Sequence, residues 1–111
     1  KSLIILFSTK GVDNNSGKPL YIMSKKYLEL YVQYSSQFYK KKKIFFKCIK
    51  PSIVVSTGNN WFKCKKDNLR KYNYYVKKYN KKGLEINSNQ IFSKLKYIIK
   101  TKNTKRLIFE I

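Results

Sequence analysis

The excess of basic over acidic side chains is the feature that most constrains how this chain can fold. Of 111 residues, 26 are Lys or Arg, 5 are Asp or Glu and none is His, which gives a formal net charge of +21 at pH 7. A compact domain with this charge repels itself unless a dense polyanion neutralises it, and nucleic acid is the commonest candidate. A surface of merely solvated lysines is the alternative, and the size of the excess argues against it.

Enough apolar material accompanies the charge to build one folded core. Hydrophobic residues make up 42% of the chain and aromatic residues 16%, whereas disorder requires low hydrophobicity together with high charge. The length suits one domain, so we expect residues 1–111 to form a single unit. No apolar run approaches the roughly 20 residues of a membrane span, and we therefore expect no membrane partner.

The choice of residues indicates an AT-rich genome. The chain contains no Ala, and Arg70 and Arg106 are its only Arg residues, while Lys, Asn, Ile, Tyr and Phe are abundant. The favoured residues have AT-rich codons, which is typical of an organellar genome or of an AT-rich protist. We therefore expect a mitochondrial (matrix) location, and Lys at positions where chemistry would favour Arg.

Short apolar segments separated by turn residues predict an all-β fold. Residues Leu28–Tyr34 alternate with period two, although a helix over Ser24–Phe38 capped by Ser24 is the competing interpretation. Turn residues recur every ~8–12 residues, which is typical of a small closed β-barrel with basic loops and little helix. The expected strands are Leu3–Phe7, Leu20–Met23, Leu28–Tyr34, Ile44–Ile49, Ile53–Ser56, Tyr72–Tyr79, Leu84–Ile86, Gln90–Leu95, Tyr97–Thr101 and Leu107–Ile111.

Catalytic and metal chemistry have little material in this sequence. Without His there is no side chain that ordinarily titrates near neutral pH, and the five acids are scattered among lysines. Cys48 and Cys64 form no CxxC pair, so we expect two reduced thiols and no zinc. The segment Gly11–Gly17 lacks the GK[ST] ending of a phosphate-binding loop. We expect neither an enzyme nor a cofactor.

Basic clusters at turns and strand ends are the candidate RNA-binding residues, because lysines there can be aligned along phosphates. The residues that we assign to rRNA binding are Lys18, Lys40, Lys41, Lys42, Lys43, Lys63, Lys65, Lys66, Arg70, Lys77, Lys78, Lys81, Lys82, Lys105 and Arg106. Aromatic residues between them offer stacking surfaces for unpaired bases: Trp61, Phe62, Tyr72, Tyr74, Tyr75 and Tyr79. We assign most of these rings to the core and regard Trp61, beside a Gly-Asn-Asn turn, as the best exception.

Several stretches resemble the universal large-subunit ribosomal protein family L-fourteen. Val12–Lys18, between two apolar segments, is similar to the Ala-Asp-Asn-Ser-Gly-Ala turn of that family, with one extra Asn. The chain lacks the Gly-Pro near the end of the family pattern and its helical tail. The other matches, in the family's order, are Lys50–Ser56, Lys65–Asp67 with Tyr74–Lys78, Ile86–Phe92 and Thr104–Ile111.

The resemblance implies a β-barrel embedded in large-subunit rRNA at the face that meets the small subunit. It further implies a bridge to small-subunit rRNA and neighbours of the L-three and L-nineteen families. The expected function is that of a structural constituent of the mitochondrial large ribosomal subunit. Another basic ribosomal protein, of the small subunit, and a free RNA-binding module are the alternatives. On this reading Val12–Gly17 closes a strand–turn–strand unit, with Gly17 in a conformation that other residues resist.

We expect the affinity for RNA to depend mainly on phosphate contacts, because the charge is spread over many turns. Binding should weaken steeply with salt, with a slope of log K against log salt of about −0.7 per phosphate neutralised on a single strand. Sequence preference should be slight. Titrations of the protein with RNAs of different sequence over a range of salt would check this, and a shallow slope with strong base preference would contradict it.

Overall fold

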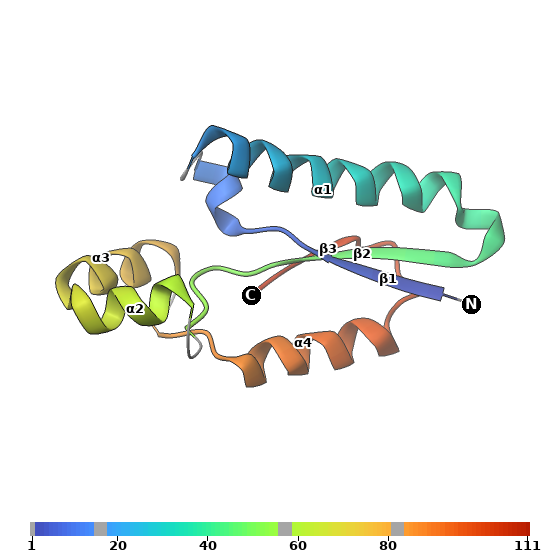
Figure 1. Ribbon diagram of the computed structural model, residues 1–111. Coiled ribbons are helices and arrows are strands. Elements are labelled where there is room, and N and C mark those ends of the chain that lie inside the picture. The colour runs from blue at the N-terminus through green and yellow to red at the C-terminus, as the bar shows by residue number, and fades with distance from the viewer. Residues whose placement is uncertain (1, 15–17, 56–58, 81–83) are drawn as a thin grey trace.

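Helices and a small parallel sheet make up this protein in the computed structural model (Figure 1), which describes residues 2–14, 18–55, 59–80 and 84–111. The elements in chain order are β1 (Ser2–Phe7), the 3-10 helix η1 (Lys10–Asn14), α1 (Pro19–Phe38), the 3-10 helix η2 (Lys40–Lys42), β2 (Ile44–Lys50), α2 (Asn60–Asp67), α3 (Leu69–Tyr79), α4 (Ser88–Lys100) and β3 (Ile108–Glu110).

The predicted all-β barrel is wrong. The described part of the chain is mostly helical, and its strands form an open three-stranded sheet. The strands expected at Leu3–Phe7, Ile44–Ile49 and Leu107–Ile111 are present as β1, β2 and β3. Two of the other expected strands, Ile53–Ser56 and Leu84–Ile86, meet in a single bridge between Val54 and Ile86 as far as their described residues go, and Ser56 lies outside those residues. The remaining expected strands are helical and lie in α1, α3 and α4.

The sheet is parallel throughout, in the order β1-β2-β3. Leu3 lies opposite Phe45, and Ile49 lies between Phe7 on β1 and Phe109 on β3. Parallel neighbours need a crossover connection, because a tight hairpin joins only antiparallel strands. The helix α1 therefore connects β1 to β2, and α4 lies on the connection from β2 to β3.

The two crossover helices cover opposite faces of the sheet (Figure 1). Side chains of β2 alternate between the faces, as the pleat requires. One core cluster lies between α1 and the sheet, and a second lies between α4 and the sheet. Their buried members are Val32, Phe46 and Cys48 in the first, and Ile98, Ile49 and Phe109 in the second.

The two crossovers have opposite hands. Both connections step in the same direction along the order β1-β2-β3, yet α1 and α4 lie on opposite faces. A pair of right-handed crossovers in this order would place both helices on one face. One connection therefore departs from the right-handed preference that governs about 98% of such units.

The sequence of α1 has a strand-like pattern because the helix is apolar on two faces. Leu28, Leu30, Val32 and Tyr34 fit a period of two, but they also occupy both sides of a helix with a period of 3.6. The competing helix over Ser24–Phe38 is confirmed and begins earlier, with Pro19 in its first turn. The strand expected at Leu20–Met23 is therefore part of α1, and the turn residues 15–17, including Gly17, lie outside the described residues.

Asparagine caps explain why the later segments are helical. The side chains of Asn59, Asn68 and Asn87 each accept a hydrogen bond from the backbone N–H three residues later. At α4 the cap is reciprocal, since the Gln90 side chain accepts from the Asn87 backbone N–H. This Asn-x-x-Gln signature was visible in the sequence, and the β-branched and aromatic content of the segment obscured it. The hairpin of α2 and α3 then buries Tyr72 and Val76 against Ile53.

Ile98 is predicted to be essential for stability. Its side chain is 0% exposed in the cluster beneath the sheet, whereas the neighbouring Ile99 is 54% exposed. Ile98→Ala should lower the free energy of unfolding by about 2–5 kcal/mol because it leaves a cavity. Ile99→Ala should cost well under 1 kcal/mol. Urea denaturation of both variants checks this, and equal losses would contradict the assignment of α4 to the core.

Candidate nucleic-acid interface

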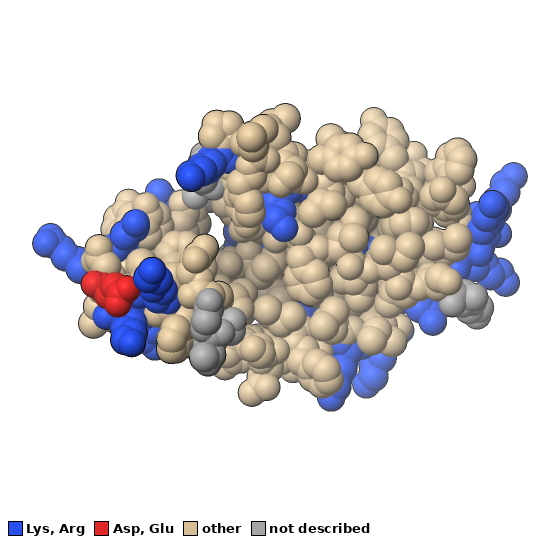
Figure 2. Space-filling model, viewed as in Figure 1, with Lys and Arg blue, Asp and Glu red and all other residues tan. Residues whose placement is uncertain are grey.

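The residues predicted to bind RNA gather at the two ends of an elongated molecule. The principal dimensions are 50 × 29 × 24 Å, and Figure 2 shows Lys and Arg at both ends with few of them between. Each predicted residue that the structure describes is exposed, and Lys81 and Lys82 lie outside the described residues. Lys18, directly before α1, belongs to neither end group.

The first group, the amino-edge patch, lies where β2 and β3 begin. The 3-10 helix η2 and the segment before β3 lie side by side there, although they are far apart in sequence. Lys40 of the former and Lys102 and Lys105 of the latter line one cavity. The amino-edge patch comprises Lys40, Lys41, Lys42, Lys43, Lys102, Lys105 and Arg106.

A buried lysine holds part of the amino-edge patch in place. The Lys47 side chain donates hydrogen bonds to the carbonyl oxygens of Thr104 and Arg106, at 2.8 and 2.6 Å. Burial lowers the pKa of Lys47 below its ordinary value. Because Lys47 lies within the central strand, these bonds tie the segment carrying Lys105 and Arg106 to the core.

The second group, the carboxyl-edge patch, lies on the hairpin of α2 and α3. Asn68 joins the two helices and caps the second of them, so basic residues from both are displayed on one compact unit. Glu85 pairs with Lys65, and this hydrogen bond is the main cause that lowers the pKa of Glu85. The carboxyl-edge patch comprises Lys63, Lys65, Lys66, Arg70, Lys71, Lys77 and Lys78.

Three of the five acids form ion pairs with lysines of the same chain. Besides Glu85, both Asp13 and Glu29 form ion pairs with Lys50, at 2.6 and 3.0 Å. With 26 basic and 5 acidic residues in the chain, even complete pairing would leave the net charge of +21 uncompensated. The net charge therefore favours the binding of external anions.

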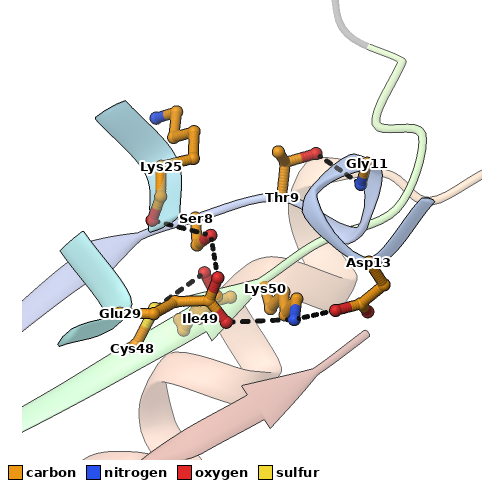
Figure 3. A network of polar contacts seen from close by, with 9 residues as sticks. All are labelled: Ser8, Thr9, Gly11, Asp13, Lys25, Glu29, Cys48, Ile49 and Lys50. Atoms are coloured by element: carbon orange, nitrogen blue, oxygen red, sulfur yellow. Dashed lines mark hydrogen bonds and ion pairs between the residues drawn. The ribbon is translucent and has the colours of Figure 1, made fainter. Parts of the chain in front are cut away.

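A polar network fixes the carboxyl ends of β1 and β2 (Figure 3). The Ser8 hydroxyl donates to Glu29 at 3.1 Å, and the Ser8 backbone N–H donates to the Ile49 carbonyl at 2.8 Å. Lys50 joins Glu29 of α1 to Asp13 of η1. Burial by itself lowers the pKa of Lys50, but hydrogen bonds from its Nζ to the two carboxylates outweigh this, and the pKa is raised.

A cavity of about 330 Å³ opens beside this network. It lies beyond the carboxyl ends of β1 and β2, which is the edge at which open parallel sheets bind ligands. Its volume is in the range of small-molecule sites. The aromatic and basic residues that line it come from η1, α1, α2 and α3, and they are Lys10, Tyr21, Trp61, Lys71, Tyr75 and Tyr79.

The rings of the cavity pack on one another and against the core cluster of Ile53, Tyr72 and Val76. Tyr75 and Tyr79 are parallel, with an interplanar angle of 3° and 5.9 Å between ring centroids. Trp61 meets Tyr75 edge to face at 5.7 Å. The hydroxyl of Ser52, which also lines the cavity, is buried and has no hydrogen-bond partner among the described residues. A polar group of a ligand could therefore satisfy it.

The sequence predicts a stacking role outside the core for Trp61 alone, and it predicts no cavity. The structure brings Trp61 together with Tyr75 and Tyr79. Tyr72 is buried in the core. The exposed rings Phe62 and Tyr74 do not line the cavity.

The assigned RNA-binding set omitted the two lysines of the cavity, as well as Tyr21. Lys71 directly follows the assigned Arg70 in the same basic cluster, so the sequence offered a reason to include Lys71 among the RNA-binding residues. Lys10 and Tyr21 lie far from the other lining residues in sequence, and only the tertiary structure brings them there.

The cysteines and acids suggest no further chemistry at this interface. Cys48 is buried in the core and Cys64 is half-buried on α2, and both are free thiols. The described residues contain no group of three or more His, Cys, Asp or Glu side chains placed to hold a metal ion. Within the same residues, no helix combines the length and the apolar character needed to cross a membrane.

Comparison with family models, curated proteins and solved structures finds no match to this chain.

Glu29→Gln is expected to destabilise the protein. The Lys50 and Glu29 side chains are only 8% and 12% exposed, and removing one partner of a buried pair costs about 3–5 kcal/mol. Because Asp13 would remain, we expect the lower end of this range. Urea denaturation near pH 7 checks it. The exposed Glu110→Gln is the matched control and should change stability by about 0.5 kcal/mol or less.

The pH dependence distinguishes this network from a general loss of packing. The folded pKa of Lys50 is raised, so the stability that the pairing contributes is fully present below the ordinary value of 10.5 and is lost as pH rises through the folded pKa. The difference between wild type and Glu29→Gln should therefore persist to pH 10.5 and shrink above it. A difference that is constant into this alkaline range would contradict the account.

Proposed function

We propose that this chain binds RNA as a structural component of a ribonucleoprotein particle. The observation that carries the proposal is the convergence of Trp61, Tyr75 and Tyr79 with two lysines at one cavity of a protein with net charge +21. Lysines at the rim of an aromatic surface suit a strand whose base stacks inside while its phosphates remain outside. Stacking is tolerant of sequence, because every base has a π-face.

The two basic patches extend this contact over a larger RNA. They lie at opposite ends of a molecule 50 Å long. At the roughly 3.4 Å of axis per nucleotide of a B-form helix, that length corresponds to on the order of 15 nucleotides of one strand, and A-form RNA, with its shorter rise, fits somewhat more. A folded RNA with a helical region and an unpaired nucleotide can contact both patches and the cavity together. The interaction would stabilise RNA shape with little base readout.

We further propose a mitochondrial ribosome as the particle. Because the L-fourteen barrel is not the fold of this chain, the residue bias and the charge are the support for an organellar ribosome. Large-subunit rRNA, the bridge to small-subunit rRNA and neighbours of the L-three and L-nineteen families stay predictions. A small-subunit protein and a free RNA-binding module compete. Co-sedimentation with the large subunit, the small subunit or neither distinguishes the three.

Trp61→Leu is predicted to weaken binding of single-stranded RNA. Loss of one stacking partner costs about 1–3 kcal/mol per base, or roughly 5- to 150-fold in affinity. Trp61 is the only Trp of the chain, so its fluorescence reports directly on stacking. We expect an unstructured RNA strand to quench this fluorescence, and a fully paired duplex of the same charge to bind with much less quenching.

Phe62→Leu is the matched control, because Phe62 is an exposed ring on the same helix but outside the cavity. Its affinity for the strand should stay within about twofold of wild type. The proposal fails if Trp61→Leu and Phe62→Leu weaken binding equally, or if strand and duplex quench Trp61 alike. Thermal unfolding of both variants in the absence of RNA verifies that each is folded.

A further inference from the structure

The outer face of α1 carries a continuous apolar stripe. Leu20, Tyr34 and Phe38 are 87%, 70% and 80% exposed. At 100° per residue the stripe occupies about 100° of the helix circumference, and its members recur at intervals of three or four residues. The complete stripe is Leu20, Met23, Tyr27, Leu30, Tyr31, Tyr34 and Phe38. Tyr31 lies at its edge and also packs edge to face on Phe46 of the sheet, with 5.9 Å between the ring centroids.

The opposite face of α1 is already occupied. Ile22 and Val32 are buried there, and Val32 packs against Phe46 and Cys48 of the sheet. The helix is thus apolar on both its inner and its outer face. Helices that are apolar all round are ordinarily buried on all sides, whereas a surface helix carries a polar outer face. The outer stripe of α1 therefore has the composition of an interface.

The order of residues in the stripe is symmetric about its centre. Reading inward from both ends pairs Leu20 with Phe38, then Met23 with Tyr34, and finally Tyr27 with the adjacent Leu30 and Tyr31. Two antiparallel copies of α1 related by a two-fold axis would place these residues opposite one another in register. An interface in which the same patch serves both partners must be self-complementary in this way.

We infer that a second copy of this chain covers the stripe, with its α1 packed antiparallel to the first. The area suits this occupant. An aromatic side chain has about 150–250 Å² of surface. With the exposed fractions of its seven residues, the stripe has a solvent-exposed area of roughly 800 Å². This is about the area that each partner buries in a standard protein interface. The stripe contains no charged residue, so its burial leaves no charge unpaired.

The charges beyond the stripe determine how the dimer responds to salt. In the antiparallel pairing, Lys40, which begins η2 just beyond one α1, lies opposite Lys18 of the other copy, and Lys41 and Lys42 follow nearby. These like charges repel, and the Debye length falls from about 10 Å at 0.1 M salt to about 3 Å at 1 M. Dimerisation should therefore strengthen as salt rises, whereas RNA binding weakens.

Sedimentation equilibrium of the full chain without RNA tests the inference. We expect a monomer–dimer equilibrium whose dimer fraction rises with protein concentration and with salt. The double variant Met23→Glu/Tyr34→Glu should stay monomeric, because the pairing brings its acidic residues together. Leu69→Glu, at an exposed Leu of α3 outside the stripe, is the control and should dimerise as wild type does. Far-UV circular dichroism confirms that the variants are folded.

Cysteine pairing tests the register. In a Cys64→Ser background, Leu20→Cys combined with Phe38→Cys should give a covalent dimer on mild oxidation, and Leu20→Cys alone should not. Efficient cross-linking by Leu20→Cys alone would indicate parallel helices and overturn the pairing.

A wild-type protein that is monomeric at every concentration and salt would overturn the dimer itself. If that monomer nevertheless binds RNA, the RNA proposal stands without the dimer. If Met23→Glu/Tyr34→Glu weakens RNA binding of such a monomer, the stripe contacts RNA instead, which likewise overturns the inference.

Discussion

The packing of β2 between α1 and α4 is the interaction on which the rest of the structure depends. This strand pairs with both other strands and buries side chains on both faces of the sheet. Phe46 and Cys48 pack towards α1, and Ile49 packs towards α4. The carboxyl end of the strand also supplies Lys50 to the polar network, and the chain just beyond it lines the cavity through Ser52. Core and candidate site are thus built on the same strand.

The fold accommodates the high charge by pairing its buried lysines and by placing most of its exposed basic residues at the two ends of the molecule. Two lysines of β2 are buried, but each has partners that compensate for its burial: Lys47 donates to two carbonyl oxygens, and Lys50 lies between two carboxylates. Most of the remaining basic residues lie at the two ends of the long axis, which keeps the two groups of charges far apart (Figure 2). Between the two ends, the apolar outer face of α1 offers a surface for another protein copy.

The proposed RNA interface and the proposed dimer interface use different physics and different surfaces. The cavity combines aromatic stacking with phosphate neutralisation, so its strength depends on the counterions released. The stripe of α1 depends on apolar burial, and charge opposes it only at its ends. An RNA that neutralises the lysines near those ends would remove this repulsion. The two interactions would then support each other, although neither requires the other to exist.

The sequence by itself determined the charge and the three strands of the sheet, and it singled out Trp61 among the aromatic residues. These follow from local composition: a run such as Ile44–Ile49 is too short and too β-branched to favour a helix. Only the tertiary structure decided that α1 is a helix and that the sheet is open and parallel. The apolar residues of α1 satisfy both periods, so the choice depends on which faces become buried, and that is a property of the whole chain. The same holds for the cavity, where Lys10 and Tyr21 meet Trp61 because parallel strands place their carboxyl ends at one edge.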